Sequence, residues 1–244
     1  MILSHSDIED IAAAVTWDFD RFFFGADDRE KRQYVQPTPI DQLAKEYLNL
    51  NVTFANLSQD GSILGLTTYA DTQFEIIQNG CSRILPLKRN QIVLDSSFIQ
   101  PGNVRRMRGR RRFTLAHECA HQILFQLEKN ESKPTHRRAY AERRVHTPRL
   151  LKTHEDWNEW QANALGAAIL MPCAEVDRAM CYLTCNKPIT RYGDYFFGDD
   201  KILIKKFCST FGVSKTAASI RLEHLGYLER RSVWEYQDPL EVVM

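Results

Sequence analysis

His117, Glu118 and His121 are close together in the sequence and could carry out metal-dependent hydrolysis. The segment around them, residues 113–125, has apolar residues at helical spacing and neither glycine nor proline, so it predicts a helix. On a helix, His117 and His121 lie one turn apart on the same face, where both imidazoles can reach one zinc ion. Glu118 is offset from that pair, in the position expected of a general base that activates water.

A catalytic zinc site usually has a third protein ligand, and a second predicted helix supplies a candidate. This helix covers residues 155–171 and ends before Pro172. One of its faces carries a carboxylate and then small or amide side chains at helical spacing: Glu159, Ala162, Asn163 and Gly166. The small residues permit a close approach to the first helix, so Glu159 can complete a His2Glu site with a fourth position open to substrate. Glu155, one turn earlier, is the alternative ligand.

Length and composition predict a globular protein. The chain has 244 residues, of which 43% are apolar, and a formal net charge of +1, which suits one or two domains with a sizeable core. It shows neither an apolar run as long as a membrane span nor a secretion signal at its N-terminus. The six cysteines lack disulfide-framework spacing, and Cys181 and Cys185 have no second close pair with which to bind structural zinc. We therefore expect a cytoplasmic protein with reduced thiols and no membrane partner.

The remaining patterns predict the elements that position the site. Residues 7–24 predict an amphipathic helix capped by Ser6 or Asp7, and residues 40–48 predict a second helix after a proline-containing linker. Strand patterns follow at residues 51–55, 63–69, 74–77 and 91–95. The sequence therefore predicts an α+β fold in which a small sheet packs on the helices that bear the HExxH motif.

Two basic segments flank the motif helix. The arginine-rich run 105–112 is interpreted as a solvated approach to that helix or a contact patch for a partner, in preference to a DNA footprint. Residues 126–153 are also basic and predict either a long surface loop or a lid with a short helix near residues 137–144.

The C-terminal region predicts a helix-turn-helix-like pair. Residues 202–207 and 214–225 form the two helices, with a turn at 211–213 and Ser214 as the cap. This pattern supports an alternative function: a DNA- or protein-binding regulator whose peptidase site is vestigial. Few polar positions are left to read bases, with Lys215 and Arg221 remaining, so direct DNA binding is not the favoured interpretation. The predicted division is a helical extension (1–36), a zinc metallopeptidase domain (37–186) and this C-terminal segment (187–244).

The two helix motifs resemble those of the ImmA/IrrE family of zinc metallopeptidases. Thr114-Leu-Ala-His-Glu-Cys-Ala-His121 is similar to the family's TLAHExxH, and the stretch from Glu159 to Pro172 is similar to its ExxANxFAAxLLMP. Residues 37–172 follow the family's layout, and residues 211–227 resemble its usual ending. The resemblance implies a gluzincin-like minimal core and zinc (Zn2+) held by His117, His121 and Glu159, with Glu118 as the base. Leu165-Gly166 departs from the family's Phe-Ala.

The same resemblance implies a function and a partner. It implies endoproteolysis of a helix-turn-helix transcriptional repressor encoded nearby, which relieves repression in mobile-element or stress-response control. The residue that stabilises the oxyanion stays open among several candidates: Tyr140, Arg143, His146 and His154. Asn163 is either a group that orients a metal ligand or part of a helix–helix hydrogen bond.

Overall fold

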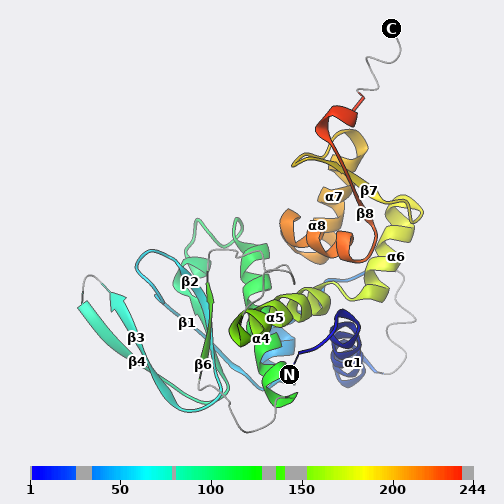
Figure 1. Cartoon of the computed structure of the whole chain (residues 1–244). Coiled ribbons are helices and arrows are strands. Elements are labelled where there is room, and N and C mark those ends of the chain that lie inside the picture. Colours follow the sequence, from blue (N-terminus) through cyan, green and yellow to red (C-terminus); the bar gives the residue numbers. More distant parts are fainter. Residues whose placement is uncertain (1, 26–34, 79–80, 128–135, 141–152, 238–244) are drawn as a thin grey trace. The chain divides into compact units, whose positions relative to one another are not determined.

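The protein is described by a computed structural model, which covers residues 2–25, 35–78, 81–127, 136–140 and 153–237 (Figure 1). Its mixture of helices and small sheets confirms the predicted α+β fold. The chain divides into two compact units, one formed by Met1–Arg32 with Thr38–Pro172 and the other by Gln33–Pro37 with Cys173–Met244. The three-part division with boundaries after residues 36 and 186 stays a prediction.

Helix α1, His5–Phe24, opens the first unit. Its cap is Ser4, whose side chain accepts a hydrogen bond from the backbone of Asp7 while the Asp7 carboxylate accepts one from the Ser4 backbone. The predicted caps Ser6 and Asp7 are therefore wrong, because the Ser4–Asp7 spacing makes a reciprocal capping box one turn ahead of the apolar pattern. The backbone N–H of Leu3 donates to Oε1 of Gln161 at 2.7 Å, which ties the start of the chain to the helix that bears Glu159.

The main sheet of this unit has four strands in the order β1-β5-β2-β6. They are β1 (Asn51–Ala55), β5 (Gln91–Asp95), β2 (Ile63–Thr68) and β6 (His136–Tyr140). Strand β1 runs parallel to β5, whereas β2 runs antiparallel to both β5 and β6. The predicted strands 51–55, 63–69 and 91–95 are confirmed.

Strand β6 corrects the interpretation of the basic segment 126–153. Residues 136–140 pair with β2 as a strand, so the short helix near 137–144 is wrong for its first four residues. Residues 141–144 lie outside the described part of the chain. The physical reason is that β2 would otherwise leave a row of unpaired backbone groups at its edge, and a strand from this segment satisfies them.

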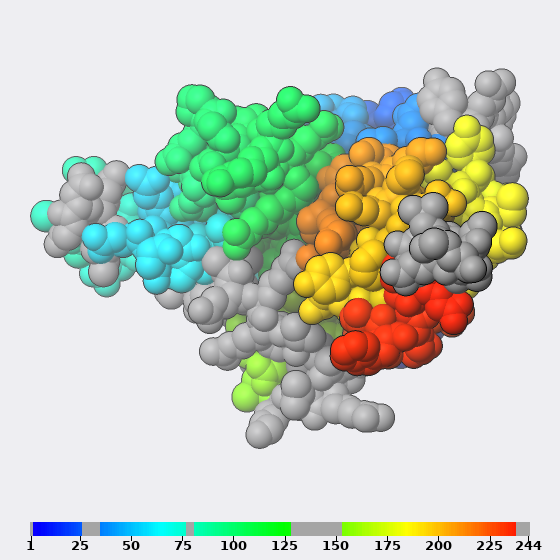
Figure 2. Space-filling view, turned by 90° about the horizontal axis from the view of Figure 1, so that it is seen from above, coloured from blue at the N-terminus to red at the C-terminus, as the bar shows by residue number. Residues whose placement is uncertain are grey.

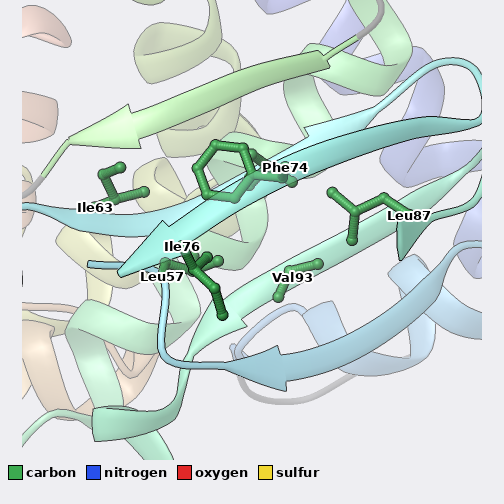
Figure 3. Packing of buried hydrophobic residues seen from close by; sticks show 7 residues of the cluster. Leu57, Ile63, Phe74, Ile76, Leu87 and Val93 are labelled. Carbon is green, nitrogen blue, oxygen red and sulfur yellow. The ribbon is translucent and has the colours of Figure 1, made fainter. Parts of the chain in front are cut away.

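A two-stranded ribbon packs on the sheet through an apolar cluster. Strand β3, Thr72–Gln78, was predicted, whereas its antiparallel partner β4, Cys81–Leu87, was not. Side chains of the ribbon and the sheet meet in one buried cluster (Figure 3), formed by Leu57, Ile63, Leu66, Phe74, Ile76, Leu87 and Val93. Alternation along β3 puts Phe74 and Ile76 on the same face, where they reach this cluster.

Two short helical segments lead from the linker to the sheet and from the sheet to the motif helix. Helix α3 (Ile40–Gln42) continues as a π-helical turn, η1 (Leu43–Tyr47), in the place of the predicted helix 40–48. The 3-10 turn η2, Ser96–Ile99, follows β5.

The motif helix α4 is longer than predicted and spans Arg108–Leu127. Its first turns include the end of the arginine-rich run. Two of those arginines form hydrogen bonds to residues in or near α3. Arg111 donates to Oδ2 of Asp41 at 3.0 Å, and the buried Arg112 donates to the carbonyl of Thr38 at 2.8 Å. The run is exposed at Arg105, Arg106, Arg108 and Arg110, as a solvated approach requires, but Arg112 is instead buried and fixes the start of α4.

Helix α5, His154–Leu170, follows with Thr153 as its N-cap, and Met171 precedes Pro172 at its end. It packs beside α4 in the first unit (Figure 1). None of the helices in the described ranges is long and apolar enough to cross a membrane.

The second unit contains the predicted helix-turn-helix-like pair. Helix α7 (Gly198–Phe211) ends at Gly212 in the left-handed conformation, and α8 (Lys215–His224) starts after its cap Ser214. The pair, the turn and the cap are therefore confirmed. Helix α6 (Cys173–Thr184) precedes them, and the parallel strands β7 (Ile189–Tyr192) and β8 (Leu228–Arg231) were not predicted.

The last described turn, η5 (Val233–Glu235), lies at the surface of this unit among the red residues of Figure 2. The six cysteines all lie in the described part of the chain, and no disulfide joins them.

Candidate metal centre

A glycine sets how closely α5 approaches α4. A Cβ added at Gly166 would lie 3.0 Å from the backbone nitrogen of His117 and 3.1 Å from the carbonyl carbon of Ala116. Even a methyl group at this position would be tightly packed against the backbone of α4, so a small residue here permits the close approach of the two helices. The prediction that small residues on α5 permit close approach to the motif helix is confirmed.

At this crossing the side chains of His117, His121 and Glu159 converge. The Nε2 atoms of the two histidines are 3.0 Å apart. Glu159 approaches both, with Oε2 3.3 Å from Nε2 of His117 and Oε1 3.1 Å from Nε2 of His121. Among the described residues these three form the one group of His, Cys, Asp or Glu side chains close enough to hold a metal ion. Glu155 is exposed and outside the group.

The spacing of these donor atoms fits a tetrahedral ion. Donors at about 2.0–2.1 Å from zinc lie roughly 3.3 Å from one another, close to the separations observed here. Oε1 of Glu159 is also buried without a hydrogen bond, although His121 Nε2 is only 3.1 Å away. The imidazole nitrogens and the carboxylate oxygens can all act as acceptors, and they face one another. A shared cation would satisfy their lone pairs together, which a hydrogen bond between two of the groups does not.

Burial and charge favour a cation at the same point. The two histidines are buried, and the Glu159 side chain is 16% exposed. Burial alone would raise the pKa of Glu159, but the positive charges that His121 and His117 can carry hold it well below its usual range. Burial would lower the pKa of His117, yet the hydrogen bond and charge of Glu159 raise it. Glu159 is thus an anion at neutral pH, as a metal ligand must be.

Asn163 orients the first histidine. Its Oδ1 lies 3.1 Å from Nδ1 of His117 and accepts a hydrogen bond when that nitrogen carries the ring proton. The Nε2 lone pair then points toward His121 and Glu159, which is the tautomer that binds metal. The contact is a helix–helix hydrogen bond, and it also orients a candidate metal ligand, so it fits both roles left open for Asn163.

Glu118 lies beside the donor group and is buried completely. Both of its carboxylate oxygens lack a hydrogen-bond partner among the described residues. Burial raises the pKa of Glu118 to about 8; the charge of His117 opposes this shift and that of Glu159 adds to it. A carboxylate with a pKa near neutrality can both accept and return a proton during catalysis.

Residues that the motif search did not single out hold α4 on the sheet. Gln122 donates to Oγ1 of Thr67 at 2.7 Å and to the carbonyl of Thr68 at 2.9 Å, so α4 is fixed to the end of β2. The Tyr69 hydroxyl donates to the backbone carbonyl of His121 at 3.4 Å. The available signal was an amide side chain directly before the apolar residues Ile123, Leu124 and Phe125, because a buried amide requires partners.

Of the four candidates for the oxyanion-stabilising role, His154 alone has a described side chain, and it lies outside the donor group. His154 is exposed, and its Nδ1 lies 3.0 Å from Nδ2 of Asn158. Arg143 and His146 lie outside the described residues, and the side chain of Tyr140 is not described.

In the second unit, the two residues expected to remain for base reading, Lys215 and Arg221, differ in exposure. Arg221, one of the two residues expected to remain for base reading, is buried, so that expectation is wrong. Lys215 lies over the ring of Phe196. Several other arginines of this unit form ion pairs, namely Arg191 with Asp194, Arg230 with Glu223 and Arg231 with Glu229. Charges neutralised in this way contribute little to phosphate binding.

An α+β unit in which a glutamate from a second helix meets an HExxH helix defines a metallopeptidase-type protein. Residues 103–223 match the family model Peptidase_M78, described as the IrrE N-terminal-like domain. The chain belongs to this family, and the predicted ImmA/IrrE relationship is confirmed. The matched range contains His117, Glu118, His121 and Glu159. No match was found among curated proteins.

Proposed function

We propose that the protein is a zinc-dependent endopeptidase in which His117, His121 and Glu159 hold the metal and Glu118 is the general base. The convergence of three donor atoms beside a buried carboxylate, within a peptidase family, carries this proposal. The donor set of two imidazoles and one carboxylate is the set that catalytic zinc takes in many peptidases.

Each residue of the proposed site has a separate role in the reaction. A bound zinc ion supplies Lewis acidity to water and to a peptide carbonyl. Glu118 takes the proton of the water that attacks the carbonyl carbon and returns it to the amine nitrogen as the C–N bond breaks. Asn163 holds the ring of His117, and the burial of both histidines keeps bulk water from competing for their lone pairs.

We further infer that the substrate is a helix-turn-helix transcriptional repressor encoded nearby, and that its cleavage relieves repression in mobile-element or stress-response control. The motifs of α4 and α5 and the ending at residues 211–227 support this substrate class through their resemblance to the ImmA/IrrE family. Such a repressor works on DNA in the cytoplasm, so the protease acts there.

The test is incubation of the zinc-loaded protein with the helix-turn-helix protein encoded beside it, followed by mass spectrometry of the fragments. We expect one or a few internal cuts that a chelator abolishes and zinc restores. A protein that carries no zinc under any loading condition contradicts the proposal. Tight, sequence-specific DNA binding by the protein, without cleavage of the repressor, would favour the alternative regulator function.

A further inference from the structure

Gly65 of strand β2 lies directly against the carboxylate of Glu118. A Cβ added at Gly65 would be 2.5 Å from Oε1 and 3.1 Å from Cδ of Glu118. It would also be 2.8 Å from the methyl carbon of Thr114, one turn earlier on α4. Two of these separations are shorter than packed carbon contacts allow. The space that Glu118 occupies therefore exists only because position 65 has no side chain.

The backbone of β2 does not itself require a glycine here. The φ angle of Gly65 lies outside the left-handed region, whereas Gly61 at +69° and Gly212 at +63° lie within it. The pairing of β2 with β6 has a register shift between Ile63 and Gly65, but an ordinary residue could adopt this conformation. The requirement at Gly65 is one of space.

The strand cannot retreat to make room for a larger residue. Gly65 pairs with Leu94 of β5 on one side and with Ala139 of β6 on the other, so its backbone is held in the interior of the sheet. Gln122 fixes α4 to the end of the same strand. The carboxylate of Glu118 is the movable partner in this contact, because it ends a flexible side chain and makes no hydrogen bond to another described residue.

We propose that Gly65 is a positioning residue for Glu118: the bare backbone of β2 at this point sets where the carboxylate of the base lies relative to the metal ligands on α4. This inference rests on the proposed function. A side chain at position 65 would push the carboxylate out of place and leave His117, His121 and Glu159 untouched, because none of these three lies among the nearest atoms to the added Cβ.

The first test compares Gly65→Ala with Gly102→Ala, a matched control in which the new Cβ meets nothing within 4 Å and φ is not left-handed. Each zinc-loaded protein is measured for bound zinc, for affinity to acetohydroxamic acid, and for kcat and KM on the repressor. Acetohydroxamic acid chelates zinc as an anion and gives its proton to a neighbouring base, so its affinity reports on Glu118 without a peptide substrate. Zinc content separates loss of the metal from displacement of the base.

For Gly65→Ala we expect full zinc content, acetohydroxamic acid affinity reduced by about tenfold and kcat reduced by about 100-fold, with KM little changed, because misplacing a catalytic group by about 1 Å costs that much. Gly102→Ala should match the wild type. If Gly65→Ala binds acetohydroxamic acid and turns over as the wild type does, the positioning role is wrong while the proposed function stands. If the wild type binds no zinc, the positioning role and the proposed function are both wrong.

A second variant distinguishes an effect on the position of Glu118 from an effect on packing. It also keeps the proposal testable if Gly65→Ala does not fold. Thr114→Ser removes the methyl group that the new Cβ would meet but leaves its contact with Glu118. We expect Gly65→Ala/Thr114→Ser to regain stability and to keep the low kcat and weak acetohydroxamic acid binding. If the double variant recovered wild-type stability, kcat and acetohydroxamic acid affinity together, Gly65 would serve packing alone. Gly65→Ala should also lower kcat no further in a Glu118→Gln background, because the base is already lost.

Discussion

The two helix pairs of this protein, α4 with α5 and α7 with α8, bury polar groups in different ways. In the first pair His117, Glu118 and His121 are buried, and the oxygens of Glu118 make no hydrogen bond to any described residue. In the second pair, Phe207 and Phe211 of α7 are buried with their ring centroids 4.6 Å apart, and Ser214 caps α8. Helix α4 thus gives up stability to hold a carboxyl group without hydrogen-bond partners where the proposed chemistry needs it. Helix α8 also buries a charged side chain, Arg221, but no buried side-chain nitrogen or oxygen of α7 or α8 lacks a partner among the described residues.

Replacement of a proposed metal ligand in the first helix pair should abolish both zinc binding and cleavage. In His117→Ala or His121→Ala we expect zinc to be lost and cleavage to disappear, because two protein ligands seldom retain zinc at a site built for three. Glu159→Ala should weaken zinc binding, while Glu155→Ala, one turn away and exposed, should not. Bound metal and repressor cleavage measured on the same samples decide the outcome. Zinc loss in Glu155→Ala but not in Glu159→Ala would move the third ligand one turn.

Glu118→Gln should separate metal binding from chemistry. The amide keeps the size of the side chain but cannot take a proton, so we expect cleavage to fall by about 10²–10⁴-fold with zinc retained. Single-turnover cleavage with parallel metal analysis measures both quantities. Cleavage by Glu118→Gln at the wild-type rate would remove Glu118 from the mechanism.

The charge pair between His117 and Glu159 should leave a pH signature in the metal-free protein. The pKa of His117 is raised in the fold, so its contribution to stability is fully present below the unfolded pKa and is lost as pH rises through the folded value. The pKa of Glu159 is lowered, so its contribution is present above the unfolded value and is lost as pH falls through the folded one. The pair is therefore most stabilising at mildly acidic pH.

Thermal melts of metal-free wild type and Glu159→Gln test this signature. We expect the difference in Tm between them to be larger near pH 6 than near pH 9. Zinc loading should reverse the trend for the wild type, since protons compete with the metal for His117 as pH falls. A difference in Tm that grows from pH 6 to pH 9 without metal would contradict the assigned ion pair.

The two helix pairs were predictable from sequence because each carries a local signal. The motif spacing on α4 and the cap at Ser214 depend on residues a few positions apart, and both are seen. Strand β6 and the partners of Arg112 were not predictable, because they depend on pairings with β2 and Thr38 that lie far away in sequence. For the same reason the contact between Gly65 and Glu118 could not be inferred, although a glycine inside a strand pattern often marks a close approach.

The smallest expected effect lies in the second helix pair and tests whether its polar groups serve stability alone. Ser214→Ala removes the side-chain oxygen that accepts a hydrogen bond from the Ala217 backbone at 3.2 Å, so the free energy of unfolding should fall by about 1 kcal/mol. Ser209→Ala, at an exposed position within α7, is the control and should be neutral or slightly stabilising. Denaturant melts measure the difference, and zinc content should stay unchanged in both variants. If Ser214→Ala lost zinc or cleavage while remaining folded, α8 would take part in the chemistry of the first pair, and the contrast between the two pairs would not hold.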